Sequence, residues 1–189
     1  AGSHHSGWSG DEIVNLFGEI LAPVQLRFNR ASKFAVATSP RSGIRRFGPY
    51  DVSLFPSGEI KCGLIYPPTM KTQRDALVNG LINGDGSNFP GFASWFRRTL
   101  NFDPRAERQS AEEQRALRKA ANDIANQGCD LVFVIVSQRN AMAYSQCKSA
   151  LLCNGVPCQF VTGARLASSM QRPWVLSNIA LASYAKVGG

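Results

Sequence analysis

Tyr144 and Lys148 stand four residues apart in a segment expected to be helical, so their side chains share one helix face. A tyrosine ring can stack on a planar base, and a lysine offers a compact charge for a phosphate. Gln159 is the polar side chain of a short apolar run, and Lys186 closes the last expected helix. Each also has an ordinary explanation: a surface pair, a side chain on an edge strand, and a cation at a helix C-terminus.

The elements that must position these side chains alternate between helices and strands. The sequence predicts helices over 11–21, 72–82, 92–100, 111–127, 141–154 and 173–187, and strands over 51–55, 60–66, 131–136 and 158–162. Ser110 and Glu113 form an expected capping box for the helix over 111–127. The continuous apolar run from Leu131 to Val136 is typical of a strand buried on both faces. This order favours a Rossmann-like α/β fold, a parallel sheet flanked by helices on both faces.

In sheets of this class, ligands bind outside the carboxyl ends of the strands, near the N-termini of the following helices. The strand that ends at Val136 leads into the loop 137–140 and then into the helix with Tyr144 and Lys148. We therefore expect the candidate site at the carboxyl edge of the sheet.

The N-terminal part of the chain is expected to lie outside this domain. Residues 1–10 are Gly/Ser-rich, contain His4 and His5, and are interpreted as a disordered remnant of an expression tag. Residues 11–50 are expected to be a lead-in or linker, with Ser39-Pro40 and Gly48-Pro49 as breakers. The domain itself is expected over 51–189.

Histidine and cysteine usage excludes several classes of site. The chain has two histidines, both in the tag-like segment, so Ser-His-Asp triads, Cys-His pairs and His-ligated zinc are excluded from the folded part. The five cysteines are odd in number and form no C-x-x-C motif, which indicates free, mostly buried thiols in a reducing compartment. No membrane-spanning run or signal peptide is visible, so a cytoplasmic location is expected.

The positive charge of the chain is concentrated in particular segments. The formal net charge is +8 at pH 7, and the sequence pI is near 9.6. No acidic side chain follows Asp130, and none lies between Glu19 and Asp51, although both stretches carry several basic ones. A positive field over part of the surface suits a polyanion, so nucleic acid is the favoured partner.

Three stretches of the C-terminal part together resemble the MID domain of Argonaute proteins: 144–161, 174–181 and 185–189. They contain the four candidate residues in the order that the family has. The segment 40–51, Pro-Arg-Ser-Gly-Ile-Arg-Arg-Phe-Gly-Pro-Tyr-Asp, is similar to the segment that precedes this domain, especially in prokaryotic Argonautes. The resemblance covers residues 40–189.

The resemblance implies that this region holds the 5′ end of a small guide RNA or DNA, for guide-directed silencing or defence. Tyr144 would stack on the first guide base, and Lys148, Gln159 and Lys186 would contact the terminal phosphate. The loop with Arg139 and Asn140 corresponds to the region that meets the first base, which makes these two residues candidates for base preference.

The resemblance also implies what this chain does not do by itself. It ends where the family continues into the PIWI domain, the expected partner, which carries the slicer carboxylates. The family often uses a magnesium ion whose protein carboxylate comes from that domain, so a metal site and catalysis are not expected here.

Two other interpretations of the sequence stay open. A Rossmann-like fold could belong to an enzyme domain for a nucleotide or a phosphosugar, although no glycine-rich phosphate-binding motif follows an expected strand. The basic lead-in and the helix over 111–127 could instead dock a protein partner. Strong salt dependence of oligonucleotide binding would favour the nucleic-acid interpretation.

Overall fold

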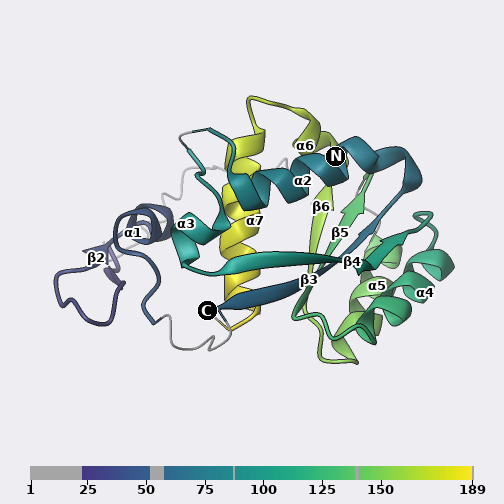
Figure 1. Ribbon diagram of the computed structural model, residues 1–189, viewed down its shortest axis with the longest axis horizontal. Coiled ribbons are helices and arrows are strands. Elements are labelled where there is room, and N and C mark those ends of the chain that lie inside the picture. The colour runs from purple at the N-terminus through teal and green to yellow at the C-terminus, as the bar shows by residue number, and fades with distance from the viewer. Residues whose placement is uncertain (1–22, 52–57, 87, 139–140, 189) are drawn as a thin grey trace, which may run out of the picture.

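The computed structural model describes residues 23–51, 58–86, 88–138 and 141–188, and its centre is a parallel sheet (Figure 1). The four strands are β3 (Glu59–Tyr66), β4 (Thr99–Gln109), β5 (Leu131–Val136) and β6 (Cys158–Thr162). They lie in the order β4-β3-β5-β6, so β6 is an edge strand. A separate antiparallel pair joins β1 (Leu26–Arg27) to β2 (Val36–Ala37). The expected Rossmann-like α/β class is confirmed.

Helices cover both faces of the sheet (Figure 1). One face carries α2 (Lys71–Asn83), α3 (Phe92–Phe96) and α7 (Arg172–Lys186). The other carries α4 (Gln114–Ala125) and α5 (Ala141–Leu152). Helix α1 (Pro40–Phe47) packs against α3 and the β1–β2 pair. Two short helices, η1 (Pro68–Met70) and α6 (Gly163–Ala167), complete the described elements.

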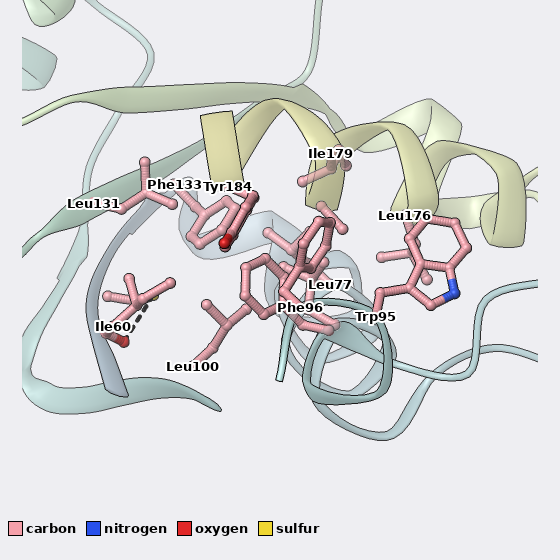
Figure 2. Close-up of a cluster of buried hydrophobic side chains, with 14 of the residues drawn as sticks. Ile60, Leu77, Trp95, Phe96, Leu100, Leu131, Phe133, Leu176, Ile179 and Tyr184 are labelled. Carbon is pink, nitrogen blue, oxygen red and sulfur yellow. Dashed lines mark hydrogen bonds between the residues drawn. The ribbon is translucent and has the colours of Figure 1, made fainter. Parts of the chain in front are cut away.

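The central strand β5 confirms the prediction of a strand buried on both faces. All six of its residues are buried. Alternate side chains enter different cores: Phe133 packs on the α7 side, whereas Val132 and Val134 pack on the α4 and α5 side. Figure 2 shows the α7-side cluster, in which Tyr184 of α7 stacks on Phe96 of α3 with ring centroids 4.4 Å apart. Aromatic packing therefore fixes the C-terminal half of α7, which ends in Lys186.

Helix α7 is also fixed near its start, where it comes very close to α2. A Cβ atom added to Gly80 of α2 would lie 2.4 Å from Cδ1 of Leu176, a fully buried side chain. The glycine therefore permits a helix approach that any larger residue would obstruct. At the first residue of α7, the partly buried Arg172 donates from Nε to Asp85 Oδ2 at 2.6 Å.

Several local predictions differ from the structure. Ser39 and Pro40 do not interrupt secondary structure but begin helix α1, because proline is tolerated at a first helical position. The Ser39 hydroxyl caps this helix by accepting from the Ser42 N–H at 3.4 Å. The expected capping box is wrong, since α4 starts only at Gln114 and Ser110 donates to the Ala111 carbonyl instead.

The helix expected over 92–100 is too long. It ends at Phe96, because Arg97 adopts a left-handed conformation (φ +54°), and the chain turns into β4, a strand that the sequence analysis missed. The division at residues 50 and 51 stays a prediction. The helix expected over 11–21 and nearly all of the strand expected over 51–55 lie outside the described residues. In the described ranges, no helix is long and apolar enough to cross a membrane.

Candidate functional site

The structure brings the four candidate residues together over the edge strand β6. Lys186 donates from Nζ to the Cys158 carbonyl at 2.8 Å and to Gln159 Oε1 at 2.6 Å. The Tyr144 ring packs against Phe160 with centroids 4.4 Å apart. The Lys148 ammonium lies 5.5 Å from the centroid of the Tyr144 ring. Side chains from α5, β6 and α7 thus form one cluster.

Two members of the cluster, Gln159 and Lys186, lie at the start of β6, so for them the expected position beyond the carboxyl ends of the strands is wrong. The adjoining cavity is lined by Val136 and Thr162, the last residues of β5 and β6. Lys186 contacts Cys158, the first residue of β6, and Gln159 is the second. The reason is the direction of α7, whose C-terminal end lies beside the start of β6. Tyr144, the fourth residue of α5, is the member that lies near a helix N-terminus.

Two of the cluster's side chains also cover the open edge of the sheet. The Pro157 carbonyl accepts from the Val132 N–H of β5, so the next carbonyl, that of Cys158, points outward, where Lys186 binds it. Two residues on, the Phe160 carbonyl accepts from Gln159 Nε2 at 2.9 Å. Lys186 and Gln159 therefore satisfy backbone groups that an edge strand would otherwise leave open.

Burial and two neighbouring charged or polar groups act on the pKa of Lys186. Burial lowers the pKa of Lys186 by desolvating its ammonium. Cys158 opposes this shift, and the positive charge of Lys148, the smallest of the three effects, adds to it. Burial raises the pKa of the Cys158 thiol, and both lysines oppose that shift. Among the described residues, neither lysine forms an ion pair with a carboxylate. The site therefore holds two positive charges that an anion would balance.

A cavity of about 700 Å³ adjoins the cluster. Tyr144 and Gln159 line it, together with apolar side chains of β6 and α7, whereas Lys148 and Lys186 stand outside its lining. Glu112 also lines the cavity, and its two carboxylate oxygens accept from the N–H and the hydroxyl of Ser137, each at 2.8 Å. The loop after β5 is thereby tied to the segment before α4.

Further residues at this cavity were not among the candidates from the sequence. Arg165 and Asn178 line it. Arg41 of α1 donates to Asn178 Oδ1 at 2.7 Å, and its guanidinium lies 4.6 Å from the Trp174 ring centroid. Arg41 and Arg165 both lie in segments without acidic side chains, and this charge pattern is the sequence signal that could have identified them. Arg139 and Asn140, the candidates for base preference, lie outside the described residues.

The described residues do not form a metal site. No group of three histidine, cysteine, aspartate or glutamate side chains in these ranges could hold an ion.

No family model matches the chain. It is 27% identical over 191 aligned residues to "Protein argonaute" of Cereibacter sphaeroides, an alignment that covers 89% of this chain and 24% of that protein. A crystal structure of Drosophila Piwi matches with a TM-score of 0.54 and 18% identity, over 70% of this chain and 18% of that one. The second match shows a shared fold. The chain spans about a quarter of the length of the argonaute protein that it matches. This match confirms the resemblance to Argonaute proteins.

Proposed function

We propose that this Argonaute-related domain anchors the 5′-phosphorylated end of a guide strand. The terminal phosphate lies between Lys148 and Lys186, and the first base stacks against Tyr144. The observation that carries the proposal is the position of two ammonium groups at the edge strand β6: Lys186 of α7 binds the Cys158 carbonyl, and Lys148 of α5 lies over the Tyr144 ring, which packs on Phe160. They stand beside an aromatic ring and a cavity.

The charge of the site suits a strand end better than a strand interior. A terminal phosphate carries about −1.5 to −2 charges at pH 7, whereas an internal diester carries one. Each charge-assisted hydrogen bond from a lysine to such a group is worth about 1.5–3 kcal/mol. Two lysines without an ion-pair partner among the described residues therefore favour the dianion, which fixes where the guide begins.

Tyr144 gives the first base a surface that does not depend on its identity. The side chain is 42% exposed, and Phe160 supports its ring from within the domain. Stacking of a base on such a ring is worth about 1–3 kcal/mol and tolerates every base. Arg165 and Asn178, which line the cavity, offer contacts for the backbone that follows.

The role that we propose for the chain is binding, and it includes no chemical step. Silencing or defence would then depend on the whole protein, in which a PIWI domain is the proposed neighbour and the guide the proposed ligand.

The experiment compares a 5′-phosphorylated oligonucleotide with its 5′-hydroxyl counterpart by fluorescence anisotropy, using RNA and DNA of one sequence. We expect Lys148→Ala to weaken binding of the phosphorylated strand by about ten- to a hundredfold, the worth of one charge-assisted bond, and to affect the hydroxyl strand much less. Tyr144→Ala should weaken both strands alike, because stacking does not involve the phosphate.

Lys33→Ala is the matched control. Lys33 is an exposed lysine between β1 and β2, where its ammonium lies 5.3 Å from the Phe34 ring centroid, and it is expected to leave the preference for phosphate unchanged. Equal affinity of the unmodified protein for both strands, or equal losses in Lys148→Ala, would refute the proposal. Free nucleoside monophosphates that bind as tightly as the oligonucleotide would favour a nucleotide-binding enzyme domain instead.

A further inference from the structure

The segment 23–51 carries a concentration of positive charge outside the four-residue cluster at β6. It contains six basic residues and one acidic residue, which gives it a formal charge of +5 in a chain of net charge +8. The basic residues are Arg27, Arg30, Lys33, Arg41, Arg45 and Arg46. The acidic residue, Asp51, pairs with Arg30 at 3.1 Å. Within the described ranges, the other five basic side chains have no carboxylate partner.

These side chains belong to a folded unit, α1 with the β1–β2 pair, which lies at one end of the long axis of the molecule, whereas α4 and α5 lie at the other (Figure 1). The Phe28 ring joins the two parts of the unit: a Cβ atom added to Gly43 of α1 would lie 2.0 Å from it, and the Phe47 ring stacks on it with centroids 6.4 Å apart. Arg97, which follows α3, extends the positive charge, because its Nε lies 3.1 Å from the Cβ position of Gly48 at the end of α1.

Cations and aromatic rings are paired on this unit. Three of the four cation–π contacts among the described residues involve it: Lys33 with Phe34 at 5.3 Å, Arg46 with Phe47 at 5.0 Å, and Arg41 with Trp174 at 4.6 Å. The Phe34 ring is 78% exposed. A cation beside such a ring can bind a phosphate while the ring stacks on a base.

The ordinary explanation covers only part of this pattern. Arg45 and Arg46 lie in the last turn of α1, where a cation interacts favourably with the helix dipole. The dipole does not explain the exposed Phe34 ring beside Lys33, nor the exposed Arg97, which is the first residue after α3.

We infer that Lys33, Phe34, Arg45, Arg46 and Arg97 form a second binding surface, here named the α1 surface, for the interior of a single-stranded nucleic acid. The cations bind phosphodiesters, and bases stack on Phe34. Exposed cations without carboxylate partners suit a polyanion, and an exposed ring suits a strand whose bases are unpaired. No strand end takes part, so the inference goes beyond the proposed function and does not depend on it.

A circular oligodeoxythymidylate tests the inference, because a closed strand has no 5′ end. Fluorescence anisotropy measures its affinity over a range of salt concentrations. We expect the double variant Arg45→Gln/Arg46→Gln to weaken binding about five- to tenfold, the worth of two exposed charge contacts. The slope of log affinity against log salt should become shallower by about 1.4, since each lost phosphate contact of a single strand removes about 0.7.

The matched control is Arg115→Gln/Arg118→Gln, which removes the same charge from two exposed arginines of α4 at the other end of the molecule. It should leave the affinity and the slope nearly unchanged. Phe34→Ala should lower the affinity about tenfold without changing the slope, because stacking releases no counterions. If the double variant at α1 does not fold, Lys33→Gln replaces it, with an expected change in slope of about 0.7.

Equal losses in the α1 and α4 double variants would show that net charge alone attracts the strand and would overturn the inference. A circular strand that does not bind would overturn it too, as would displacement of that strand by polyglutamate, which would indicate an acidic protein partner. A duplex that binds as tightly, with no effect of Phe34→Ala, would contradict the preference for a single strand. If the circular strand binds but a linear strand gains nothing from a 5′-phosphate, the proposed function alone fails, so the two failures are distinct.

Discussion

The close approach of α2 and α7 at Gly80 and Leu176 yields a stability prediction that can be worked out in advance. A Cβ atom at position 80 would lie 2.4 Å from Leu176 Cδ1, 3.2 Å from its Cδ2 and 3.4 Å from its Cγ. Leu176 is fully buried, with aromatic and aliphatic neighbours in the same core cluster. Its side chain therefore has no open space into which it could move.

Two effects of opposite sign decide the outcome of Gly80→Ala. Alanine is favoured over glycine inside a helix by about 1 kcal/mol. Forcing an extra methyl group into a packed core costs about 1–3 kcal/mol. The distance of 2.4 Å to Leu176 Cδ1 is far below van der Waals contact, and Leu176 is enclosed by the core. We therefore expect a steric cost in the upper part of the range of about 1–3 kcal/mol, and a net destabilisation by Gly80→Ala of about 1–2 kcal/mol.

Urea denaturation of the variants measures this balance. The adjacent, exposed Asn79 supplies the control, since the difference between Asn79→Gly and Asn79→Ala gives the helix preference without any steric cost. In the Leu176→Ala background the space is empty, so Gly80→Ala should become stabilising by about 1 kcal/mol. If Gly80→Ala stabilises the unmodified protein as much as the control predicts, the argument from close packing is wrong.

Two further predictions concern titrating groups. Burial, and to a smaller extent Lys148, lower the pKa of Lys186. The affinity for a 5′-phosphorylated oligodeoxyadenylate should therefore fall as pH rises through a window that begins below the ordinary lysine pKa of about 10.4. Lys186→Arg should move that fall to higher pH, and identical alkaline profiles would contradict the assignment. At the cysteines, burial raises the pKa of Cys147 to about 12 and also raises those of Cys62, Cys129 and Cys158, whereas Cys153 is exposed. Alkylation at pH 8 should therefore modify one thiol quickly in the native protein and all five after denaturation, and a second fast thiol would contradict this burial pattern.

The parts of the fold that the sequence predicted are those with strong local patterns. The apolar run at 131–136 requires burial on both faces wherever it lies, and the structure places it at the centre of the sheet. Strand β4 lacks such a pattern, because only Leu100 and Ala106 are buried within it. Its pairing also jumps from Cys62–Phe102 to Leu64–Glu107, which inserts extra residues around Pro104. An edge strand tolerates this proline, so tertiary pairing decided its structure and local propensity did not.

The residue types of the candidate site were predictable, and their arrangement was not. The spacing of Tyr144 and Lys148 places them on one helix face in any fold. The meeting of Lys186 with Gln159 depends on β6 being an edge strand with α7 beside it, and the sequence does not state the order of strands in a sheet. The contact between Arg41 and Asn178 joins residues 137 positions apart, for which no local pattern exists.

The absence of carboxylates after Asp130 has a physical consequence at this site. Burial desolvates the Lys186 ammonium and lowers its pKa, and repulsion by the Lys148 ammonium adds a smaller effect of the same sign. A nearby aspartate or glutamate would relieve the repulsion, but it would also occupy the lysines and repel a phosphate. Neutral acceptors, the Cys158 carbonyl and the Gln159 amide, orient Lys186 without cancelling its charge. The uncompensated charge therefore remains available, and under the proposed function a doubly charged strand end would gain more from it than a singly charged diester.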